Sequence, residues 1–436
     1  MTRTEIGQLR DHVGQVVRIC GWVQALRLQR KMQFVIVRDP SGSLQVTHRR
    51  GGEDDPIEQA LEGLTPQSAV AITGLVKANE IVNLGGLELI PEKIEVLATA
   101  ETPLPIDLES GPEVQQDWRF LDVRMRPQQR HVFAIQTCVE QGMREQAYAE
   151  GFTEMHTPKL MGTASESGAE VFALEYFGRK AYLAQSPQFF KQMTIGAGIE
   201  RTFEIGPVFR AEPSFTSRHS TEFTGVDVEI AWIDDVEDVM QFEERMLRHT
   251  LEKVKERYGD LIRETYDVDV VVPELPFPRL TMAQAREVLE KAGWTPTKAK
   301  GDLDPAGERL LSAHVREEYG HEFVFVTQYP ISVRPFYHMR EADDPQVTKS
   351  FDLLWKGLEI TTGAQREHRY DVLVAQAAEK GMNTEPMRDY LNVFRYGTPP
   401  HGGFGLGLNR FLMVLLGLGS IRDVTFLFRG PNRLEP

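Results

Sequence analysis

The segment RTFEIGPVFRAEPSFTSRHSTEFTGVDVEIAWI carries the densest group of side chains that could do chemistry. Two strand-like arms flank a polar loop, and residues two apart in a strand share a face. Arg210 and Glu212 therefore point together on the first arm, as do Phe223, Asp227 and Glu229 on the second. A guanidinium beside carboxylates suits a triphosphate and its magnesium ion. A charged hairpin of this kind is otherwise a solvated sheet edge, and the segment alone leaves both interpretations open.

A second segment, PPHGGFGLGLNRFLMVLLGLG, places Gly403, Gly405 and Gly407 at alternating positions before an apolar helix. Alternating glycines leave one strand face without side chains, which predicts room for a flat ligand against the backbone. Arg410 stands where a dinucleotide-binding fingerprint needs its third glycine, and no Gly-Lys-Ser/Thr of a phosphate-binding loop follows. Close packing of strand and helix is the alternative explanation for the glycines.

Charge and composition limit what these segments can belong to. The chain has 436 residues, with 49 Lys and Arg against 64 Asp and Glu, a net charge of −15. This acidity argues against indiscriminate binding to nucleic acid or anionic membranes. Residues 1–50 differ, because nine basic and three acidic groups give them a net charge of +6. A small basic region on a large acidic body is therefore expected.

Cysteine content and hydropathy indicate the cellular setting. Cys20 and Cys138 are the two cysteines and form no Cys-x-x-Cys pair, which argues against a disulfide framework or a cysteine zinc site. The longest apolar run, 411–421, is too short to cross a bilayer. We expect a cytoplasmic protein without a membrane association.

The elements that must position these residues divide into a barrel and a larger α+β region. Residues 16–48 alternate as three short strands, and a helix near 56–64 precedes two further strands. This order predicts a five-stranded barrel of the OB type, although other small β-barrels fit it. A Pro-rich connector follows, and then a helix that begins near Pro127 and ends at Gly151. We predict an α+β multidomain protein, with a barrel over 1–103, a linker over 104–130, and a domain over 131–436 that contains a helix-rich insertion at about 278–320.

Three ordered motifs resemble those of the class II aminoacyl-tRNA synthetases. Motif 1 is similar to GFTEMHTPKL with Pro158, motif 2 to FRAEPSFTSRHSTEF and motif 3 to GGFGLGLNR, while the class I hallmarks are absent from the sequence. The resemblance covers the whole chain. It implies a catalytic domain built on an antiparallel sheet flanked by helices, an anticodon-binding OB domain, and a homodimer formed through motif 1.

Within this class the chain resembles the aspartate enzymes of the compact archaeal and eukaryotic type, which implies ATP and Mg²⁺ as requirements. By this resemblance Arg210 is the catalytic residue that clamps the ATP α-phosphate and the amino-acid carboxylate. The implied ATP-binding residues are Arg210, Glu212, Arg218, His219, Ser220, Phe223, Glu359, Gly407 and Arg410. Phe223 and Arg410 would sandwich the adenine, and Glu359 with Thr362 would hold magnesium.

The implied aspartate-binding residues are Glu166, Gln188, Lys191, Arg210, Asp227, Tyr337, Thr362 and Arg366. Aspartate and asparagine are nearly isosteric, so a pocket for aspartate must offer cations to the side-chain carboxylate. Lys191 and Arg366 would supply them, Asp227 would bind the ammonium group, and Glu166 matches a loop that closes over the substrate. Each of these residues taken alone is more often a solvated surface group.

In the barrel, Phe34 and Gln45 match the family's anticodon-binding pair, with Arg27, Arg30 and Lys31 nearby for phosphates. The alternating pattern by itself favours Phe34 as a core residue. The implied partners are tRNA(Asp), with tRNA(Asn) as a second candidate. The absence of a bulky aromatic at Gln24 favours relaxed tRNA choice.

Several positions depart from the family pattern, and three other functions stay open. Asn409 stands where an acidic residue usually precedes the motif 3 arginine, which predicts altered support for Arg410 rather than lost activity. His338 and Arg340 are also unexpected. The alternatives are an asparagine enzyme, an amide-forming synthetase of the same fold, and a non-catalytic RNA-binding regulator.

Overall fold

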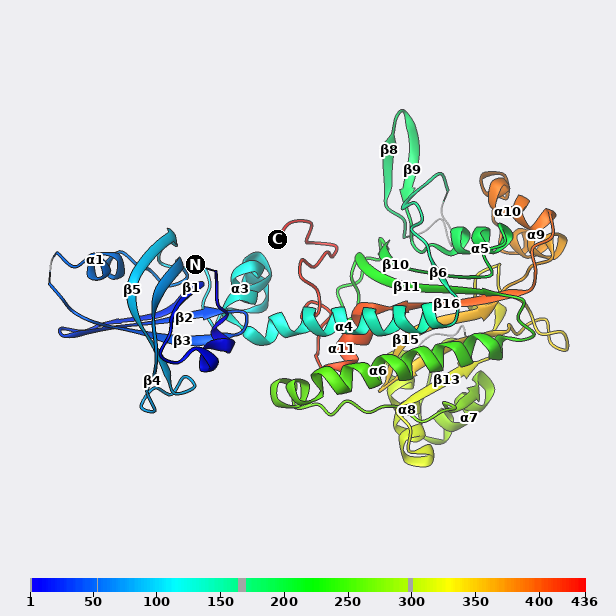
Figure 1. Cartoon of the computed structure of the whole chain (residues 1–436). Helices are drawn as coiled ribbons and strands as arrows, with labels where there is room; N and C mark the ends of the chain where they lie inside the picture. Colours follow the sequence, from blue (N-terminus) through cyan, green and yellow to red (C-terminus); the bar gives the residue numbers. More distant parts are fainter. Residues whose placement is uncertain (1, 53, 164–169, 297–300) are drawn as a thin grey trace. The chain divides into compact units, whose positions relative to one another are not determined.

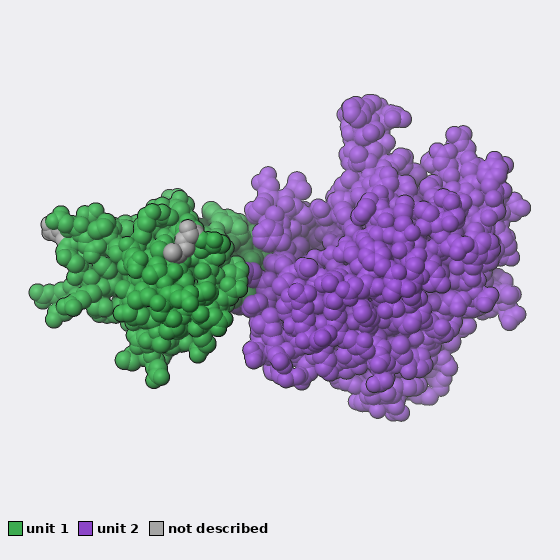
Figure 2. Space-filling model, in the orientation of Figure 1, with its two compact units in different colours: residues 1–127 green, residues 128–436 purple. Residues whose placement is uncertain are grey.

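The computed structural model describes residues 2–52, 54–163, 170–296 and 301–436. The chain forms two compact units, residues 1–127 and residues 128–436 (Figure 2). The division falls within the segment expected to be a linker. Among the described helices, none combines the length and the apolar character that a membrane span requires.

The first unit is a closed five-stranded barrel with the strand order β1-β2-β3-β5-β4 (Figure 1). Its elements are η1 (Ile6–His12), β1 (Val16–Leu28), β2 (Met32–Asp39), β3 (Gly42–Arg49), α1 (Pro56–Glu62), β4 (Ala69–Ala78) and β5 (Leu87–Ala98). Val35 and Val37 are buried and alternate with partly exposed neighbours, as a strand with one core face requires. Helix α1 begins where the Asp55 carboxylate accepts from Ile57 N at 2.8 Å. The prediction of an OB-type barrel is confirmed.

Two short helices, α2 (Pro112–Asp117) and α3 (Arg119–Met125), complete this unit. Arg119 and Asp122 form a buried ion pair at 2.6 Å. Arg38 of β2 donates to the Met125 carbonyl at 3.2 Å. The C-terminal end of α3 is therefore hydrogen-bonded to the barrel.

The second unit is built on an eight-stranded sheet with the order β12-β13-β14-β15-β16-β11-β10-β6. Its strands are β6 (Thr153–Glu154), β10 (Arg201–Phe209), β11 (Glu222–Ala231), β12 (Arg279–Thr281), β13 (Phe323–Thr327), β14 (Ser350–Trp355), β15 (Leu358–Gln365) and β16 (His401–Gly407). All neighbours are antiparallel except the pairs β12–β13 and β10–β6. The expected antiparallel sheet flanked by helices is confirmed.

The two faces of this sheet differ in character. Val226, Val228 and Ile230 of β11 belong to the main hydrophobic core, together with residues of α4 (Pro127–Ala149), α6 (Val236–Tyr266) and α11 (Leu408–Leu415). Because side chains alternate along a strand, Asp227 and Glu229 lie on the opposite face. Helices α4 and α6 approach closely, since a Cβ at Gly142 would lie 2.9 Å from Thr250 Cα. The helices thus leave one polar sheet face available for a site.

The remaining elements surround this polar face. They are β7 (Leu160–Met161), β8 (Ala173–Tyr176), β9 (Arg179–Leu183), α5 (Gln188–Gly196), α7 (Met282–Lys291), α8 (Pro305–Tyr319), η2 (Ile331–Val333), α9 (Tyr370–Glu379), η3 (Glu385–Met387) and α10 (Arg388–Arg395). Helix α5 contacts β10 and β11. Helices α7 and α8 pack against β13 in the segment expected to be a helix-rich insertion. Strands β7, β9 and β8 form a separate small sheet, from which the β8–β9 hairpin projects (Figure 1).

Candidate active site

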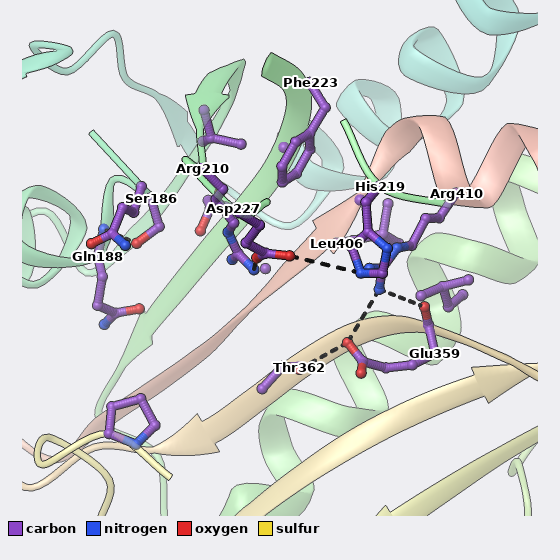
Figure 3. A pocket seen from close by; sticks show the side chains of 18 of the residues that line it. Ser186, Gln188, Arg210, His219, Phe223, Asp227, Glu359, Thr362, Leu406 and Arg410 are labelled. Carbon is purple, nitrogen blue, oxygen red and sulfur yellow. Dashed lines mark hydrogen bonds and ion pairs between the residues drawn. The ribbon is translucent and has the colours of Figure 1, made fainter. Parts of the chain in front are cut away.

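A cavity of about 390 Å³ opens on the polar face of the large sheet (Figure 3). Its lining residues come from positions as far apart in the chain as Gln185 and Ile421. The predicted ATP- and aspartate-binding residues that line it are Gln188, Lys191, Arg210, Glu212, Arg218, His219, Ser220, Phe223, Asp227, Tyr337, Glu359, Thr362, Arg366, Gly407 and Arg410. Glu166 lies outside the described residues.

The floor of the cavity is set by strand register. Asp227 of β11 pairs with Gly405 of β16, and Gly405 pairs with Thr362 of β15. Directly paired residues in an antiparallel sheet point to the same face. These three positions therefore form one row across the sheet, below the space that a ligand would fill.

Lys191 of α5 is buried against this floor. Its Nζ lies 3.1 Å from Asp227 Oδ1 and 3.3 Å from Glu229 Oε2, and it donates to the Phe404 carbonyl at 3.0 Å. Burial raises the pKa of Asp227, and Lys191 counteracts part of that rise. The buried ammonium is thus held by two carboxylates at the pocket wall.

Arg366, which directly follows β15 and forms an isolated bridge with His338, is the second buried cation. Its Nε lies 3.0 Å from Glu229 Oε1, and its Nη1 lies 3.1 Å from His338 Nε2. Burial and then the Arg366 charge hold the pKa of His338 well below its ordinary value, so the ring is neutral and its Nε2 accepts. Although burial opposes it, Arg366 and Lys191 lower the pKa of Glu229. Glu229 is therefore the shared counter-ion of both cations.

Glu229 and Arg334 are site residues to which the sequence assigned no role. The alternation of residue types along β11 placed Glu229 on the polar face of the sheet, but it could not show that Lys191 and Arg366 are its partners. Arg334 lines the cavity, forms an ion pair with Asp352 at 2.7 Å and stacks on Tyr329 at 3.7 Å from the ring centre. Nothing in the spacing of the sequence indicated Arg334, because Asp352 meets it only through the fold.

The mouth of the cavity is formed by the motif 2 hairpin. Arg210 Nη1 lies 3.9 Å from Glu212 Oε1, and its guanidinium lies 5.7 Å from the centre of the Phe223 ring. Burial lowers the pKa of His219, and the charge of Arg410 adds to that effect. Arg218 pairs with Glu308 of α8 at 3.1 Å. The hairpin thus presents cations, an aromatic ring and a neutral imidazole to one space.

Arg410, Glu359 and Thr362 lie together beside the hairpin, with Arg410 next to His219 (Figure 3). Arg410 Nη1 is 3.6 Å from Glu359 Oε1, and the Thr362 hydroxyl donates to the same carboxylate oxygen at 3.4 Å. Burial, followed by the charge of Asp352, raises the pKa of Glu359 to about 7. Asp352 and Glu308 act to raise this pKa, while Arg410 and Arg334 act to lower it. The Glu359 carboxylate and the Thr362 hydroxyl are hard oxygen donors of the kind that suits Mg²⁺.

The three alternating glycines do not all have the role that the sequence predicted for them. A Cβ at Gly403 would lie 2.3 Å from a Glu229 carboxylate oxygen, and one at Gly405 would lie 3.2 Å from Asp227. Gly405 and Gly407 line the cavity, whereas Gly403 is not among its lining residues. The idea that all three make room for a flat ligand is therefore wrong for Gly403, where the backbone of β11 and the Glu229 carboxylate leave no space for a side chain, since a Cβ would lie 1.9 Å from the Val228 carbonyl oxygen.

Asn409 supports the motif 3 region through two hydrogen bonds. Its Oδ1 accepts from Thr224 N at 3.2 Å, and its Nδ2 donates to Thr425 Oγ1 at 3.2 Å. Arg410 bonds instead to the carbonyls of Arg218 and Glu359. Asn409 thus ties together the strand and the C-terminal segment beside Arg410.

The lining of the cavity is richer in cations than the chain as a whole. Among its lining residues that the structure describes, six are Lys or Arg and three are Asp or Glu. The carboxylates of Glu229, Asp352 and Glu308 pair with four of these cations from outside the lining. The guanidinium groups at the cavity can bind phosphate or carboxylate oxygens, and Phe223 offers a face for a flat ring.

The predicted anticodon residues lie on the outer face of the barrel. Phe34 alternates with buried Val35 and is only partly covered, so the core alternative for Phe34 is wrong. Phe34 pairs with Arg27 on one side and Thr47 on the other, which places their side chains on one face. Gln45 lies on the same face and donates to Thr47 Oγ1 at 3.0 Å. The structure thus brings Phe34, Gln45 and Arg27 together on one surface of the barrel.

Family comparison agrees with both units. Residues 111–429 match the class II tRNA synthetases (D, K and N), and residues 17–97 match the OB-fold nucleic acid binding domain. The chain belongs to the class II aminoacyl-tRNA synthetase family.

Its relatives place it further within that family. It is 41% identical to an aspartate–tRNA(Asp/Asn) ligase of Aeropyrum pernix, over 97% of this chain and 96% of the relative. It is 40% identical to an aspartate–tRNA(Asp) ligase of Pyrococcus abyssi, over 97% of each chain. Among solved structures, an asparaginyl-tRNA synthetase of Pyrococcus horikoshii complexed with asparaginyl-adenylate is similar over 100% of both chains, with a TM-score of 0.92 and 32% identity.

Proposed function

We propose that this chain is an aspartate–tRNA ligase that activates L-aspartate with ATP and transfers the aspartyl group to the 3′ end of tRNA(Asp). The observation that carries the proposal is the pair of buried cations, Lys191 and Arg366, at the wall of the cavity. Relatives of about 40% identity named as aspartate ligases support it.

An asparagine enzyme is the second candidate, because of the similarity to the Pyrococcus horikoshii structure. The side chains of the two amino acids differ by a carboxylate and a neutral amide. A carboxylate forms charge-assisted hydrogen bonds with lysine or arginine, whereas an amide leaves part of the cationic charge uncompensated. Lys191 and Arg366 therefore favour aspartate, and the identity to the asparaginyl enzyme is the lower of the two, at 32%.

The chain's own residues suffice for a mechanism of positioning and electrostatics. Asp227 would bind the substrate ammonium, while Arg210 would hold the reacting carboxylate against the α-phosphate. The aspartate carboxylate then attacks the α-phosphorus, and pyrophosphate leaves, which gives aspartyl-adenylate. The terminal hydroxyl of the tRNA attacks the acyl carbon of this adenylate, loses its proton and forms the ester as AMP leaves. Arg210 would stabilise the developing charge, and no side chain need become a covalent nucleophile. Magnesium, held by Glu359 and Thr362, would supply further neutralisation of phosphate charge.

ATP–pyrophosphate exchange with aspartate and with asparagine tests this proposal. We expect exchange with aspartate and little with asparagine. Lys191→Met should lower kcat/KM for aspartate at least about 30-fold, since one partner of a buried charge pair is lost. Lys356→Met, at a lysine that pairs with Glu322 away from the cavity, is the matched control and should change little. Exchange with asparagine alone would establish the asparagine enzyme, and no exchange with either would favour an RNA-binding regulator.

We further propose that the barrel binds the anticodon and tolerates both tRNA(Asp) and tRNA(Asn). Gln24 is exposed at a register shift in β1, and its side chain accepts from Ser43 Oγ at 3.2 Å. A polar side chain there takes the place of a bulky aromatic ring, and this supports a relaxed choice of tRNA. Charging assays on both transcripts test this idea, and strict refusal of tRNA(Asn) would overturn it. We also expect a cytoplasmic homodimer formed through motif 1, which sedimentation would reveal.

A further inference from the structure

The β8–β9 hairpin is a feature that the proposed chemistry does not use. Its two-residue turn is Phe177–Gly178, and both residues have positive φ, 48° and 75°. Such a turn matches the twist of the strands, but its first position favours Asn, Asp or Gly. A phenylalanine there costs stability, and its ring is 90% exposed, so packing does not compensate for the cost. Stability of the fold therefore does not explain a phenylalanine at this position, which indicates a role in binding.

The surroundings of Phe177 combine aromatic rings with cations. Tyr176 is also exposed, and its ring meets that of Phe177 edge to face at 4.9 Å. Arg179 is paired with Tyr176 across the ladder, and Lys180 follows it on the other face. Within the residues that the structure describes, Arg179 and Lys180 form no ion pair with a carboxylate. Arg179 shares a face with the exposed Tyr176 ring, whereas Lys180 is paired with Glu175 on the other face and its Nζ lies 5.2 Å from the centre of the Tyr182 ring. The tip of the hairpin therefore offers a cation on each face.

The hairpin is directly continuous with the wall of the cavity. Strand β9 runs on into Gln185 and Ser186, which line the cavity. Ala184 lies between the end of β9 and Gln185, and its carbonyl accepts a hydrogen bond from Phe209 N at 2.9 Å. Phe209 directly precedes Arg210. A ligand that enters the cavity by one end and continues outward could follow β9 to the hairpin tip (Figure 1).

We propose that the hairpin tip binds the single-stranded 3′ segment of tRNA, with a base stacked on Phe177 and phosphates held by Arg179 and Lys180. Exposed rings for stacking, together with cations for the backbone, are the combination that single-stranded nucleic acid requires. The proposal rests on the proposed function, because the 3′ end must reach the cavity to take the aspartyl group. A protein partner at the same rings is the competing outcome.

Phe177→Asn tests the ring without harming the hairpin, because asparagine suits the turn better than phenylalanine. We expect the KM for tRNA to rise at least about fivefold, the low end for loss of one base–aromatic stack. Phe177→Trp should retain the wild-type KM. Pyrophosphate exchange, which needs no tRNA, should be unchanged in both variants. If wild-type exchange with aspartate is absent, the proposed function fails; if exchange is present but Phe177→Asn leaves the KM for tRNA unchanged, this inference fails.

Two further measurements identify the ligand. Replacing Arg179 and Lys180 by Gln should reduce the slope of log K against log salt for tRNA binding by about 0.7 for each lost phosphate contact. In an equilibrium binding assay, wild type should bind intact tRNA more tightly than Phe177→Asn does, and removing the unpaired 3′ nucleotides from the tRNA should abolish this difference in affinity. A difference that persists would overturn the single-strand assignment. A change in oligomeric state without a change in tRNA binding would overturn the proposal in favour of a protein contact.

Discussion

Glu229 Oε1 lies 3.0 Å from Arg366 Nε, while the other oxygen of the same carboxylate lies 3.3 Å from Lys191 Nζ. One buried carboxylate thus joins the two cations on which the choice of aspartate depends. Removing it would leave buried positive charge that Asp227 alone cannot balance. The specificity site and the stability of the sheet are therefore linked through Glu229.

Glu229→Gln should lower the free energy of unfolding by about 3 to 5 kcal/mol, since breaking a buried pair leaves an uncompensated charge. Urea denaturation measures this change. Glu385→Gln removes an exposed partner of Arg388 and should change stability by no more than about 0.5 kcal/mol. Equal effects of the two substitutions would contradict the assigned role of Glu229.

Glu243 of α6 provides a prediction about pH. Burial raises its pKa to about 8, with Thr361 opposing the rise and Glu244 adding to it. Because the folded pKa is above the ordinary value, this group stabilises the fold fully below about pH 4.5, and the contribution is lost as pH rises to about 8. Glu243→Gln should therefore be more stable than wild type at pH 8.5, by up to roughly 5 kcal/mol, and nearly equal at pH 5. Thermal unfolding across this range measures the gap, with exposed Glu264→Gln of the same helix as the control; a gap independent of pH would refute the assignment.

Glu359→Gln tests the magnesium site. The concentration of Mg²⁺ that gives half-maximal exchange should rise in this variant. The rise should exceed roughly tenfold, which is the loss of metal affinity when a residue that only supports a metal ligand is replaced. With a pKa of about 7, the wild-type carboxyl binds a proton below neutrality, and the proton competes with the metal. The wild-type Mg²⁺ requirement should therefore fall between pH 6 and pH 8, whereas that of the variant should not. Parallel pH profiles for the two proteins would argue against Glu359 as a ligand.

Phe34→Ala tests the barrel surface. We expect the KM for tRNA to rise at least about fivefold, because a stacking platform for one base is lost. Exchange without tRNA should be unaffected. Val96→Ala, at an exposed apolar residue of β5 on the same barrel, is the control. A similar effect of both substitutions would show that Phe34 acts through barrel stability and not through RNA contact.

The sequence by itself determined the elements and most of the site. Alternation of apolar residues placed the barrel strands, because a strand that buries one face must repeat every two residues. The motif residues, from Arg210 to Arg410, were recognisable because motifs 2 and 3 are each contiguous in the chain. The ATP- and aspartate-binding residues that the resemblance implied all line one cavity in the fold, apart from Glu166, which lies outside the described residues. The alternation also placed Asp227 and Glu229 on one face of their strand.

Only the tertiary structure decided which charges meet. Glu229 and Arg366 are 137 residues apart, and their contact depends on the register of β11, β16 and β15. The same register places the Glu229 carboxylate beside Gly403, where the sequence predicted a contact with a ligand. The ion pair between Arg334 and Asp352 and the outward orientation of Phe34 on the barrel also depend on the packing of distant strands. Pairing across strands is set by the packing of the whole sheet, which no local pattern of residue types records.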